Sequence, residues 1–197
     1  MKTALIVFVK NIGSEPVKSR IGHEVGSHMA DAIYGELLAA TRQLCAGINH
    51  DIHVYYSHHL DYNDEWTGVA KERQLQDQSA DLGRRMRAAF EDLLPHYDKV
   101  AIIGSDCPYL TPALMEEAFE ALDKVDVVFG PSHDGGYYLL GLKKMLPALF
   151  EGIAWSTDQV LAQSLDKLGS TGSSFAKLDY LEDIDTYAAY ERWKHGV

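Results

Sequence analysis

Short apolar runs and longer amphipathic stretches alternate along most of this chain. Largely apolar runs, which are typical of strands covered on both faces, occupy residues 3–9, 100–103, 125–130 and 137–142, and the run 100–103 is unbroken. Between them, apolar residues recur at helical spacing, which predicts amphipathic helices over 27–45 and in later stretches. The alternation predicts an α/β fold, a three-layer α/β/α sandwich around a mainly parallel mixed sheet.

Residues that flank the amphipathic stretches predict where the helices begin and end. Asp81 and Thr111 fit the N-cap position, and Pro112 fits the first position of the helix that Thr111 opens. Residues 156–159, Ser-Thr-Asp-Gln, have the sequence of a capping box, and Gly169 fits the end of the helix that this box would open.

Three regions give weaker or mixed patterns. Residues 51–57 alternate as a strand, whereas 60–80 are polar and predict either a long active-site loop or a short edge hairpin. Residues 177–181 predict a last strand, and Asp185 fits the N-cap of a closing helix. Asp185 is also a carboxylate at a strand end, and the two interpretations do not exclude each other.

The composition narrows the class of protein. The 197 residues, 46% of them hydrophobic, are enough for one domain, residues 1–197. A formal net charge of −11 disfavours binding to nucleic acid or to an anionic membrane, because both need a basic surface. Cys45 and Cys107 form no CxxC pair, and the N-terminal apolar run is too short to span a bilayer. We therefore expect a cytoplasmic protein without membrane insertion.

Asp106 is the first candidate for a chemical role. It follows the apolar run 100–103 and Gly104, so we expect it at the carboxyl end of a central strand, where ligands bind in open α/β sheets. A carboxylate at this place, before Pro108, could hold a metal ion or a ligand hydroxyl. Alternatively, Asp106 only ties its own turn together, as Asx side chains commonly do.

The loop 10–22 follows the first predicted strand and carries three cations, Lys10, Lys18 and Arg20. Exposed backbone amides and flexible cations of this kind suit a phosphate group. The loop has neither the spacing of a Walker A motif nor a GxGxxG fingerprint, and an ordinary solvated loop is the alternative.

A Gly-Gly turn separates two of the apolar runs. His133 and Asp134 are expected to project from its mouth, and Gly135 and Gly136 allow a close approach of the backbone to a ligand. A plain hairpin turn is the alternative.

Two further features have mixed interpretations. Trp155 serves either as a stacking surface or as core filler. In the helix after Asp81, the arginines Arg84, Arg85 and Arg87 are expected on the face opposite the apolar residues.

Six motifs, taken in order, resemble a known family. They are Lys10 with Val-Lys-Ser-Arg (17–20), Gln78 to Gly83 before the arginine-bearing helix, Gly-Ser-Asp-Cys-Pro (104–108), Gly-Pro-Ser-His-Asp-Gly-Gly-Tyr-Tyr (130–138), Trp-Ser-Thr (155–157) and Asp-Ile-Asp-Thr (183–186). The series is similar to a bacterial family assigned to the glycosyltransferases, most of whose members have no established reaction. That family belongs to the nucleotide-diphospho-sugar transferase superfamily with the GT-A type fold, which is related to small nucleotidyltransferases. The resemblance covers nearly the whole chain.

The resemblance implies roles for particular side chains. A divalent cation, Mg or Mn, would be held by Asp106 and Asp185. The nucleotide phosphates and nucleobase would be bound by Lys10, Lys18, Arg20, Gln78, Asp81 and Gly83. The acceptor or sugar would face His133, Asp134, Gly135, Gly136, Trp155, Ser156 and Thr157.

These roles predict a metal-dependent transferase that takes a nucleotide or nucleotide-sugar donor and a small-molecule acceptor. Carboxylates that hold Mg or Mn, together with a few cations, stabilise the charge that develops on a departing diphosphate. Asp106, Lys18 and Asp134 are the predicted catalytic residues, and Asp134 would be the base where the acceptor is a sugar hydroxyl. The absence of an Asp-x-Asp sequence at Asp106 favours nucleotidyl over glycosyl transfer, and the sequence leaves a homodimer open.

One departure from the family supports an alternative. Members usually carry a Lys-x-Pro-x-Pro-Gly run, whereas this chain has Lys-Asn-Ile-Gly-Ser-Glu-Pro (10–16), with Glu15 introduced. A negative charge beside a triphosphate is unfavourable. A non-catalytic nucleotide-binding or regulatory protein on the same fold is therefore the alternative, and the missing GxGxxG disfavours an oxidoreductase on a Rossmann sheet.

Overall fold

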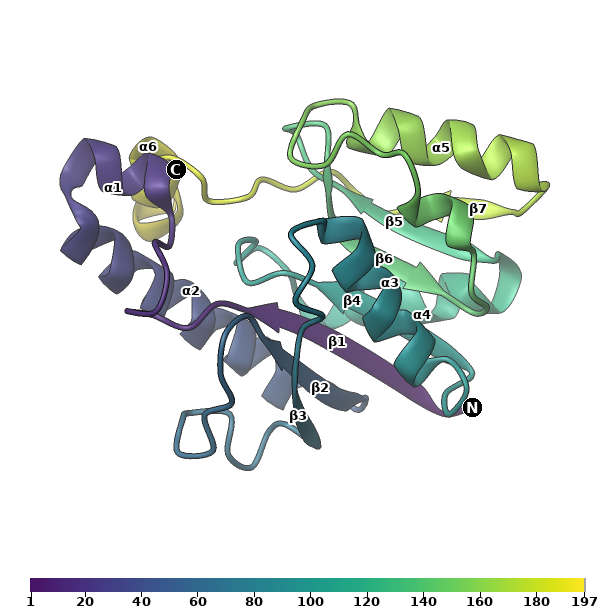
Figure 1. Cartoon of the computed structure of the whole chain (residues 1–197), viewed down its shortest axis with the longest axis horizontal. Helices are drawn as coiled ribbons and strands as arrows, with labels where there is room; N and C mark the ends of the chain where they lie inside the picture. Colours follow the sequence, from purple (N-terminus) through teal and green to yellow (C-terminus); the bar gives the residue numbers. More distant parts are fainter. Residues whose placement is uncertain (197) are drawn as a thin grey trace.

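The computed structural model describes residues 1–196, and its centre is a seven-stranded sheet with the strand order β3-β2-β1-β4-β6-β5-β7 (Figure 1). Neighbouring strands are parallel except for β6, which is antiparallel to both β4 and β5. The predicted mainly parallel mixed sheet is confirmed. The strands are β1 Thr3–Val9, β2 Asp51–Tyr56, β3 Glu72–Leu75, β4 Lys99–Ile103, β5 Val127–Pro131, β6 Tyr137–Leu142 and β7 Phe175–Lys177.

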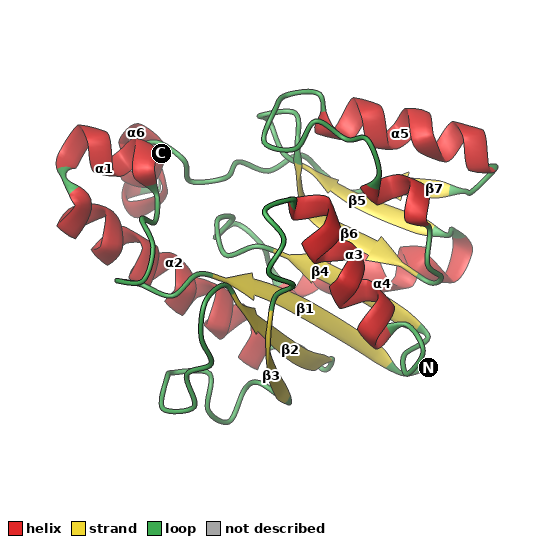
Figure 2. Cartoon of the chain, in the orientation of Figure 1, coloured by secondary structure: helices red, strands yellow, loops and turns green. Residues whose placement is uncertain are grey.

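Helices cover both faces of the sheet, which completes the predicted three-layer sandwich (Figure 2). One apolar cluster joins the sheet to α2 and α4, and another joins its opposite face to α3, α5 and the 3₁₀ helix η1. The strands β1 and β4 lie between these clusters, which explains their unbroken apolar runs. The helices are α1 Ser19–Val25, α2 Ser27–Ala46, α3 Leu82–Leu93, α4 Pro112–Lys124, η1 Pro147–Phe150, α5 Val160–Thr171 and α6 Tyr187–His195.

The strand order changes direction between β1 and β4. The chain runs outward from β1 to β2 and β3, and then returns to place β4 on the other side of β1. Val7 of β1 pairs with Ile103 of β4, so Lys10 and Asp106 follow these paired residues at the same level of the sheet. In open α/β sheets, ligands bind at such a switch point, outside the carboxyl ends of the strands.

A third apolar cluster lies beyond this carboxyl edge. It joins α1, α2 and α6 through side chains that include Ile21, Ile33 and Ile184. To reach it, residues 178–186 cross the edge of the sheet between β7 and α6 (Figure 1). The backbone N–H of Ile184 donates to the carbonyl of Asp106 at 2.8 Å, so the crossing segment is fastened to the end of β4.

Two of the predicted N-caps are confirmed. Asp81 accepts a hydrogen bond from the backbone N–H of Arg84, and Thr111 caps α4 in the same way with Pro112 in its first turn. The predicted capping box at 156–159 is wrong, because α5 begins only at Val160 and no side chain caps it.

Two other helix boundaries differ from the prediction. The helix α5 continues past Gly169 and ends before Gly172, whose left-handed conformation (φ 67°) stops it. The N-cap of α6 is Thr186 rather than Asp185. The carboxylate of Asp185 is therefore free for another partner.

Three loop or strand regions also differ. Residues 72–75 form a parallel edge strand, so the predicted edge hairpin is wrong. The last strand occupies 175–177 rather than 177–181, and the loop 10–22 already contains the start of α1. Among residues 1–196, no helix is both long enough and apolar enough to cross a membrane.

Candidate functional site

A cleft with a volume of about 720 Å³ opens at the carboxyl ends of β1 and β4. Its walls come from the loop after β1, the start of α3, the turns after β4 and β5, and the segments before α5 and α6. The structure brings most of the predicted site residues into this cleft: Lys10, Lys18, Arg20, Asp106, Asp134, Gly136, Trp155, Ser156, Thr157 and Asp185.

Lys18 is the centre of the charged end of the cleft. Its Nζ atom lies 2.7 Å from Oδ1 of Asp106 and 3.1 Å from Oδ1 of Asp185. The side chain of Lys18 is only 5% exposed, whereas those of Asp106 and Asp185 are 47% and 42% exposed. Two carboxylates from distant parts of the chain thus converge on one cation.

The backbone of Lys18 is held in the left-handed region, with φ 45°, at the N-cap of α1. This conformation is uncommon for a residue with a side chain, and it persists only where the surroundings enforce it. Burial alone would lower the pKa of Lys18, but the charges of Asp106 and Asp185 and the hydrogen bonds to them raise it. Lys18 is therefore fully charged.

Asp183 is a site residue that the sequence interpretation left without a role. Burial raises the pKa of its carboxyl to about 7, and the charges of Asp106, Asp134 and Asp185 contribute to the increase. It lines the cleft on the segment that Ile184 fastens to β4. Its position two residues before Asp185 was visible in the Asp-Ile-Asp-Thr motif, but its burial depends on the fold.

The Gly-Gly turn is held together by Asp134. One oxygen of its carboxylate, Oδ1, accepts hydrogen bonds from Ser132 Oγ and from the backbone N–H of Gly136, the latter at 2.9 Å. Asp134 lines the cleft, but this oxygen already serves the turn. Asp134 is consequently less suited than Asp183 to act as a base.

Two other residues of this turn, His133 and Gly135, do not line the cleft. His133 stacks on Tyr180, with ring centroids 5.6 Å apart. Gly135 has φ 88°, and a Cβ atom at this position would collide with the backbone of Asp158. The glycine thus permits close packing between the turn and the segment before α5, rather than contact with a ligand.

The three residues predicted to contact the nucleobase, Gln78, Asp81 and Gly83, also lie outside the cleft lining. Gln78 is exposed, and its side-chain amide donates to the carbonyl of Gln76 at 2.9 Å. Asp81 caps α3, and Gly83 lies against the indole of Trp155, where a Cβ atom would collide with the ring. Gly83 therefore positions Trp155, which lines the cleft.

Gln76 and Arg85 line this side of the cleft instead. The amide of Gln76 donates to the carbonyls of Val9 and Tyr55 at 3.2 and 3.0 Å, and its oxygen accepts from Nη1 of Arg85 at 2.9 Å. Arg85 was expected on the polar face of its helix, opposite the apolar residues. It is half-buried at the border between the two faces, which helical periodicity alone does not resolve.

The remaining cations are near the mouth of the cleft. Nζ of Lys10 lies 3.7 Å from Oε2 of Glu15, whose other oxygen lies 3.2 Å from Nδ1 of His58. Arg20 is largely exposed, with Nη1 3.7 Å from Oδ2 of Asp185. The acidic residue introduced into the first loop is thus paired with Lys10.

The acidic end of the cleft suits a hard divalent cation. Asp106 and Asp185 supply carboxylate oxygens, the ligands that Mg and Mn prefer, and they already converge on one positive charge. Among residues 1–196, no three His, Cys, Asp or Glu side chains are grouped closely enough to form a complete metal site. A metal ion here would therefore complete its coordination with water or with phosphate oxygens, which is common for Mg.

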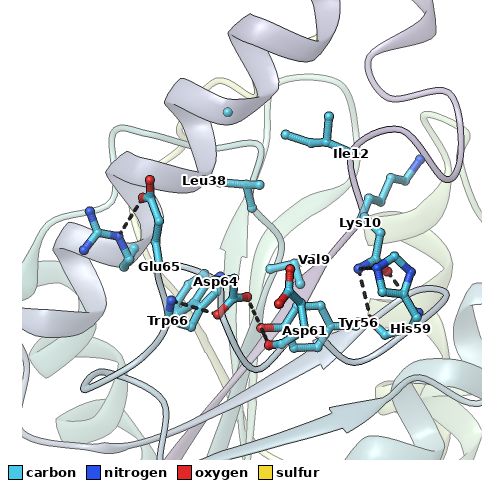
Figure 3. Close-up of a pocket in the computed structure, with 13 residues that line it drawn as sticks. Val9, Lys10, Ile12, Leu38, Tyr56, His59, Asp61, Asp64, Glu65 and Trp66 are labelled. Carbon is cyan, nitrogen blue, oxygen red and sulfur yellow. Dashed lines mark hydrogen bonds and ion pairs between the residues drawn. The ribbon is translucent and has the colours of Figure 1, made fainter.

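A second, smaller hollow of about 310 Å³ lies between α2 and the loop after β2 (Figure 3). Most of its charged groups are already paired. Asp64 accepts from the hydroxyl of Tyr56, and Nε of Arg42 lies 3.3 Å from Oε2 of Glu65. We therefore place the candidate site in the larger cleft.

Comparison with protein families gives one match. A family model described as "Uncharacterized protein conserved in bacteria (DUF2064)" matches residues 22–157, which include β4 and most of the cleft. No curated protein matches the chain.

Solved structures share the fold. A "putative nucleotide-diphospho-sugar transferase" from Desulfovibrio desulfuricans G20 has a TM-score of 0.82 and 29% identity, covering 94% of this chain and 84% of that chain. CMP:2-keto-3-deoxy-manno-octonic acid synthetase, complexed with CTP, has a TM-score of 0.62 and 12% identity, covering 99% and 98%. Rv0371c from Mycobacterium tuberculosis H37Rv, in complex with manganese, has a TM-score of 0.56 and 12% identity, covering 100% of both chains. At 12% identity, the last two similarities show the fold alone. The fold is that of nucleotide-diphospho-sugar transferases, as the resemblance implied.

Proposed function

This chain belongs to the DUF2064 family of bacterial proteins, and we propose that it is a metal-dependent transferase. It takes a nucleotide-activated donor, glycosyl or nucleotidyl, and a small-molecule acceptor. The observation that carries the proposal is the convergence of Asp106 and Asp185 on the ammonium of Lys18 at the β1/β4 switch point. The complexes of similar folds with CTP and with manganese support the same choice of ligands.

Most charged residues of the cleft have a task in this reaction. Asp106 and Asp185 would hold Mg or Mn, which when bound neutralises charge on the departing phosphate group. Lys18 and Arg20 lie beside these carboxylates, so they are placed to bind phosphate oxygens, and Lys10 is near the cleft mouth. Phosphoryl and glycosyl donors need this positioning and charge stabilisation more than a dedicated nucleophile.

Asp183 is our candidate for the base that accepts a proton from an acceptor hydroxyl. A pKa of about 7 is well matched to proton transfer near neutral pH. Burial raises this pKa most, and the three neighbouring carboxylates raise it further. Asp134, which serves its own turn, then has a supporting role in orienting the acceptor.

The first experiment is a thermal-shift screen of nucleoside triphosphates and nucleotide sugars, each with and without Mg or Mn. A ligand at roughly 100 times its Kd stabilises the folded protein by about 2.7 kcal/mol, which moves the Tm by several degrees. We expect a shift that needs both nucleotide and metal, and that is lost in Asp106→Asn. The matched control is Asp166→Asn, an exposed aspartate of α5 outside the cleft, which should shift as the wild type does. No shift in well-folded wild type would exclude the proposal.

Product analysis then separates the two kinds of transfer. Nucleotidyl transfer from a triphosphate releases pyrophosphate, whereas glycosyl transfer from a nucleotide sugar releases a nucleotide. A second candidate, a nucleotide-binding protein without turnover, is favoured by the pairing of Glu15 with Lys10, which removes a cation from the first loop. Tight binding without either product, across a panel of sugar and polyol acceptors, would select this second candidate.

A further inference from the structure

Arg85 differs from the other arginines of the chain. Each of those six has a guanidinium nitrogen close to a carboxylate, and they are Arg20, Arg42, Arg73, Arg84, Arg87 and Arg192. Within residues 1–196, Arg85 has no carboxylate partner, and its Nε atom is buried without a hydrogen bond. The chain has a net charge of −11, so carboxylates are abundant, yet none pairs with this half-buried cation. We therefore expect Arg85 to pair with a ligand in the cleft.

The orientation of Arg85 is fixed by a neutral group. Gln76 is buried, and its amide nitrogen donates to two backbone carbonyls, so its oxygen must be the atom that faces Arg85. That oxygen accepts one guanidinium hydrogen at 2.9 Å. A carboxylate in this position would have neutralised Arg85, whereas an amide orients it and leaves its charge available.

The surroundings of Arg85 favour a flat ring over a phosphate. Phe8, Leu82 and Met86 line the cleft with it and belong to one apolar cluster. The N-terminus of α3 is already capped by Asp81, so its backbone amides add little to an anion site. Of the other cleft cations, Lys18 and Arg20 lie with Asp106 and Asp185 at the metal-binding end, and Lys10 pairs with Glu15.

We infer that Arg85 is a specificity residue that reads the edge of the nucleobase of the donor. This inference rests on the proposed function. A guanidinium presents two parallel N–H groups, so it selects a base with two neighbouring acceptor atoms. Guanine offers O6 with N7, and cytosine offers O2 with N3. In adenine, the 6-amino group, a donor, lies next to both N7 and N1. In uracil, the donor N3–H lies between the two carbonyls. The protein therefore prefers a guanine or a cytosine nucleotide to an adenine or a uracil nucleotide.

The test is calorimetric titration of GTP, CTP, UTP and ATP, with Mg, into wild type, Arg85→Met and Arg85→Lys. Arg84→Met is the matched control, because Arg84 is the neighbouring arginine of α3, is exposed, and pairs with Asp77. In Arg85→Met, we expect the affinity for the preferred base to fall about 10-fold or more and the affinity for ATP to change less than about 2-fold. Arg85→Lys keeps the positive charge but lacks the two parallel N–H groups. This variant should therefore lose the selectivity between bases and keep part of the affinity for nucleotides. ITP, which retains O6 and N7, and 7-deaza-GTP, which lacks N7, then distinguish the guanine edge from the cytosine edge.

Three results would overturn the inference. An equal loss for all four nucleotides in Arg85→Met, together with a loss of inorganic pyrophosphate binding, would make Arg85 a phosphate ligand. An unchanged order of affinities in the folded Arg85→Lys variant would remove Arg85 from specificity even where Arg85→Met fails to fold. Wild type that binds none of the four nucleotides would overturn the proposed function as well, whereas the first two results leave that function standing.

Discussion

The Nζ atom of Lys18 lies 2.7 Å from Oδ1 of Asp106, at the point where the chain brings a second carboxylate, Asp185, to the end of β4. An ammonium thus lies where our proposed function requires a divalent cation. A metal ion held by Asp106 and Asp185 would take the place of the ammonium of Lys18, which would then be available to phosphate oxygens of the donor. Metal and nucleotide should therefore favour each other's binding, because each removes the same internal competitor.

Replacing Lys18 should have opposite effects on the two ligands. In Lys18→Met, the carboxylates lose their internal cation, so we expect Mn²⁺ to bind about 10-fold tighter in the absence of nucleotide, since a hydrogen bond to a charged group contributes about 1.5–3 kcal/mol. The affinity for a nucleoside triphosphate in the presence of Mn²⁺ should fall. Calorimetry and the electron paramagnetic resonance of bound Mn²⁺ measure both. Lys124→Met, an exposed lysine of α4, controls for the loss of one charge. Weaker Mn²⁺ binding in Lys18→Met would contradict the idea that the metal ion and the ammonium of Lys18 compete for the same carboxylates.

The raised pKa of Asp183 predicts a pH dependence of stability. Its carboxyl titrates at about 7 in the folded protein and near the ordinary value of 3.8 in the unfolded chain. Between these values the folded state binds a proton that the unfolded state has released, so this residue makes the protein less stable as pH rises from about 4 to 7. Asp183→Asn removes the effect and should be about 2–4 kcal/mol more stable than wild type at pH 8, with little difference at pH 4.

Urea denaturation in EDTA at several pH values checks this difference. EDTA matters because a bound cation would stabilise the ionised carboxylate of wild type and hide the effect. Asp166→Asn, on the exposed face of α5, should follow the wild-type profile. A constant difference between Asp183→Asn and wild type at all pH values would show that Asp183 does not titrate near neutrality.

The sequence predicted the sheet and most of its helices because each depends on local periodicity. The buried positions of β1 are all apolar, as are those of β4 after Lys99, and Asp81 and Thr111 cap helices through bonds to residues three positions away. The same local rules failed at Asp185, because Thr186 next to it is an equally good N-cap and the hydrogen bond went there. The carboxylate of Asp185 pairs with Lys18 instead.

The site was predictable only where strand ends define it. Asp106 could be placed because it directly follows β4, whereas the burial of Asp183 depends on α6 packing against α1 and α2. Gln76 and Arg85 were missed because their pairing joins the end of β3 to α3, and nothing in helical spacing separates Arg85 from Arg84. Tertiary contacts of this kind are not encoded in any single window of the sequence.

His53 should make the protein less stable in mild acid. Burial lowers its pKa, and its Nε2 lies 2.9 Å from the hydroxyl of Tyr97. The unfolded chain takes up a proton on this imidazole at a higher pH than the folded protein does. The stability that His53 contributes is therefore present above about pH 6.5 and lost as pH falls, by up to about 1.4 kcal/mol per pH unit. His53→Gln should remove this slope from urea-denaturation profiles between pH 7 and 5, and the exposed His96→Gln should keep it. Parallel stability profiles of His53→Gln and wild type would show that His53 does not cause the loss of stability in mild acid.

Two helical glycines should respond to alanine in opposite ways. Gly83 in α3 faces the indole of Trp155, and a Cβ atom there would overlap the ring, whereas Gly169 in α5 has open space around its Cα. Gly169→Ala should gain about 1 kcal/mol from helix propensity alone. Gly83→Ala makes the same gain but forces the indole away, so we expect a net loss of about 1–3 kcal/mol in urea denaturation. Because Trp155 is part of the cleft wall, Gly83→Ala should also weaken the nucleotide-dependent thermal shift, which Gly169→Ala leaves unchanged. Equal stabilisation by both substitutions would mean that Trp155 does not rest on α3, and the cleft wall would then have to be formed by another side chain.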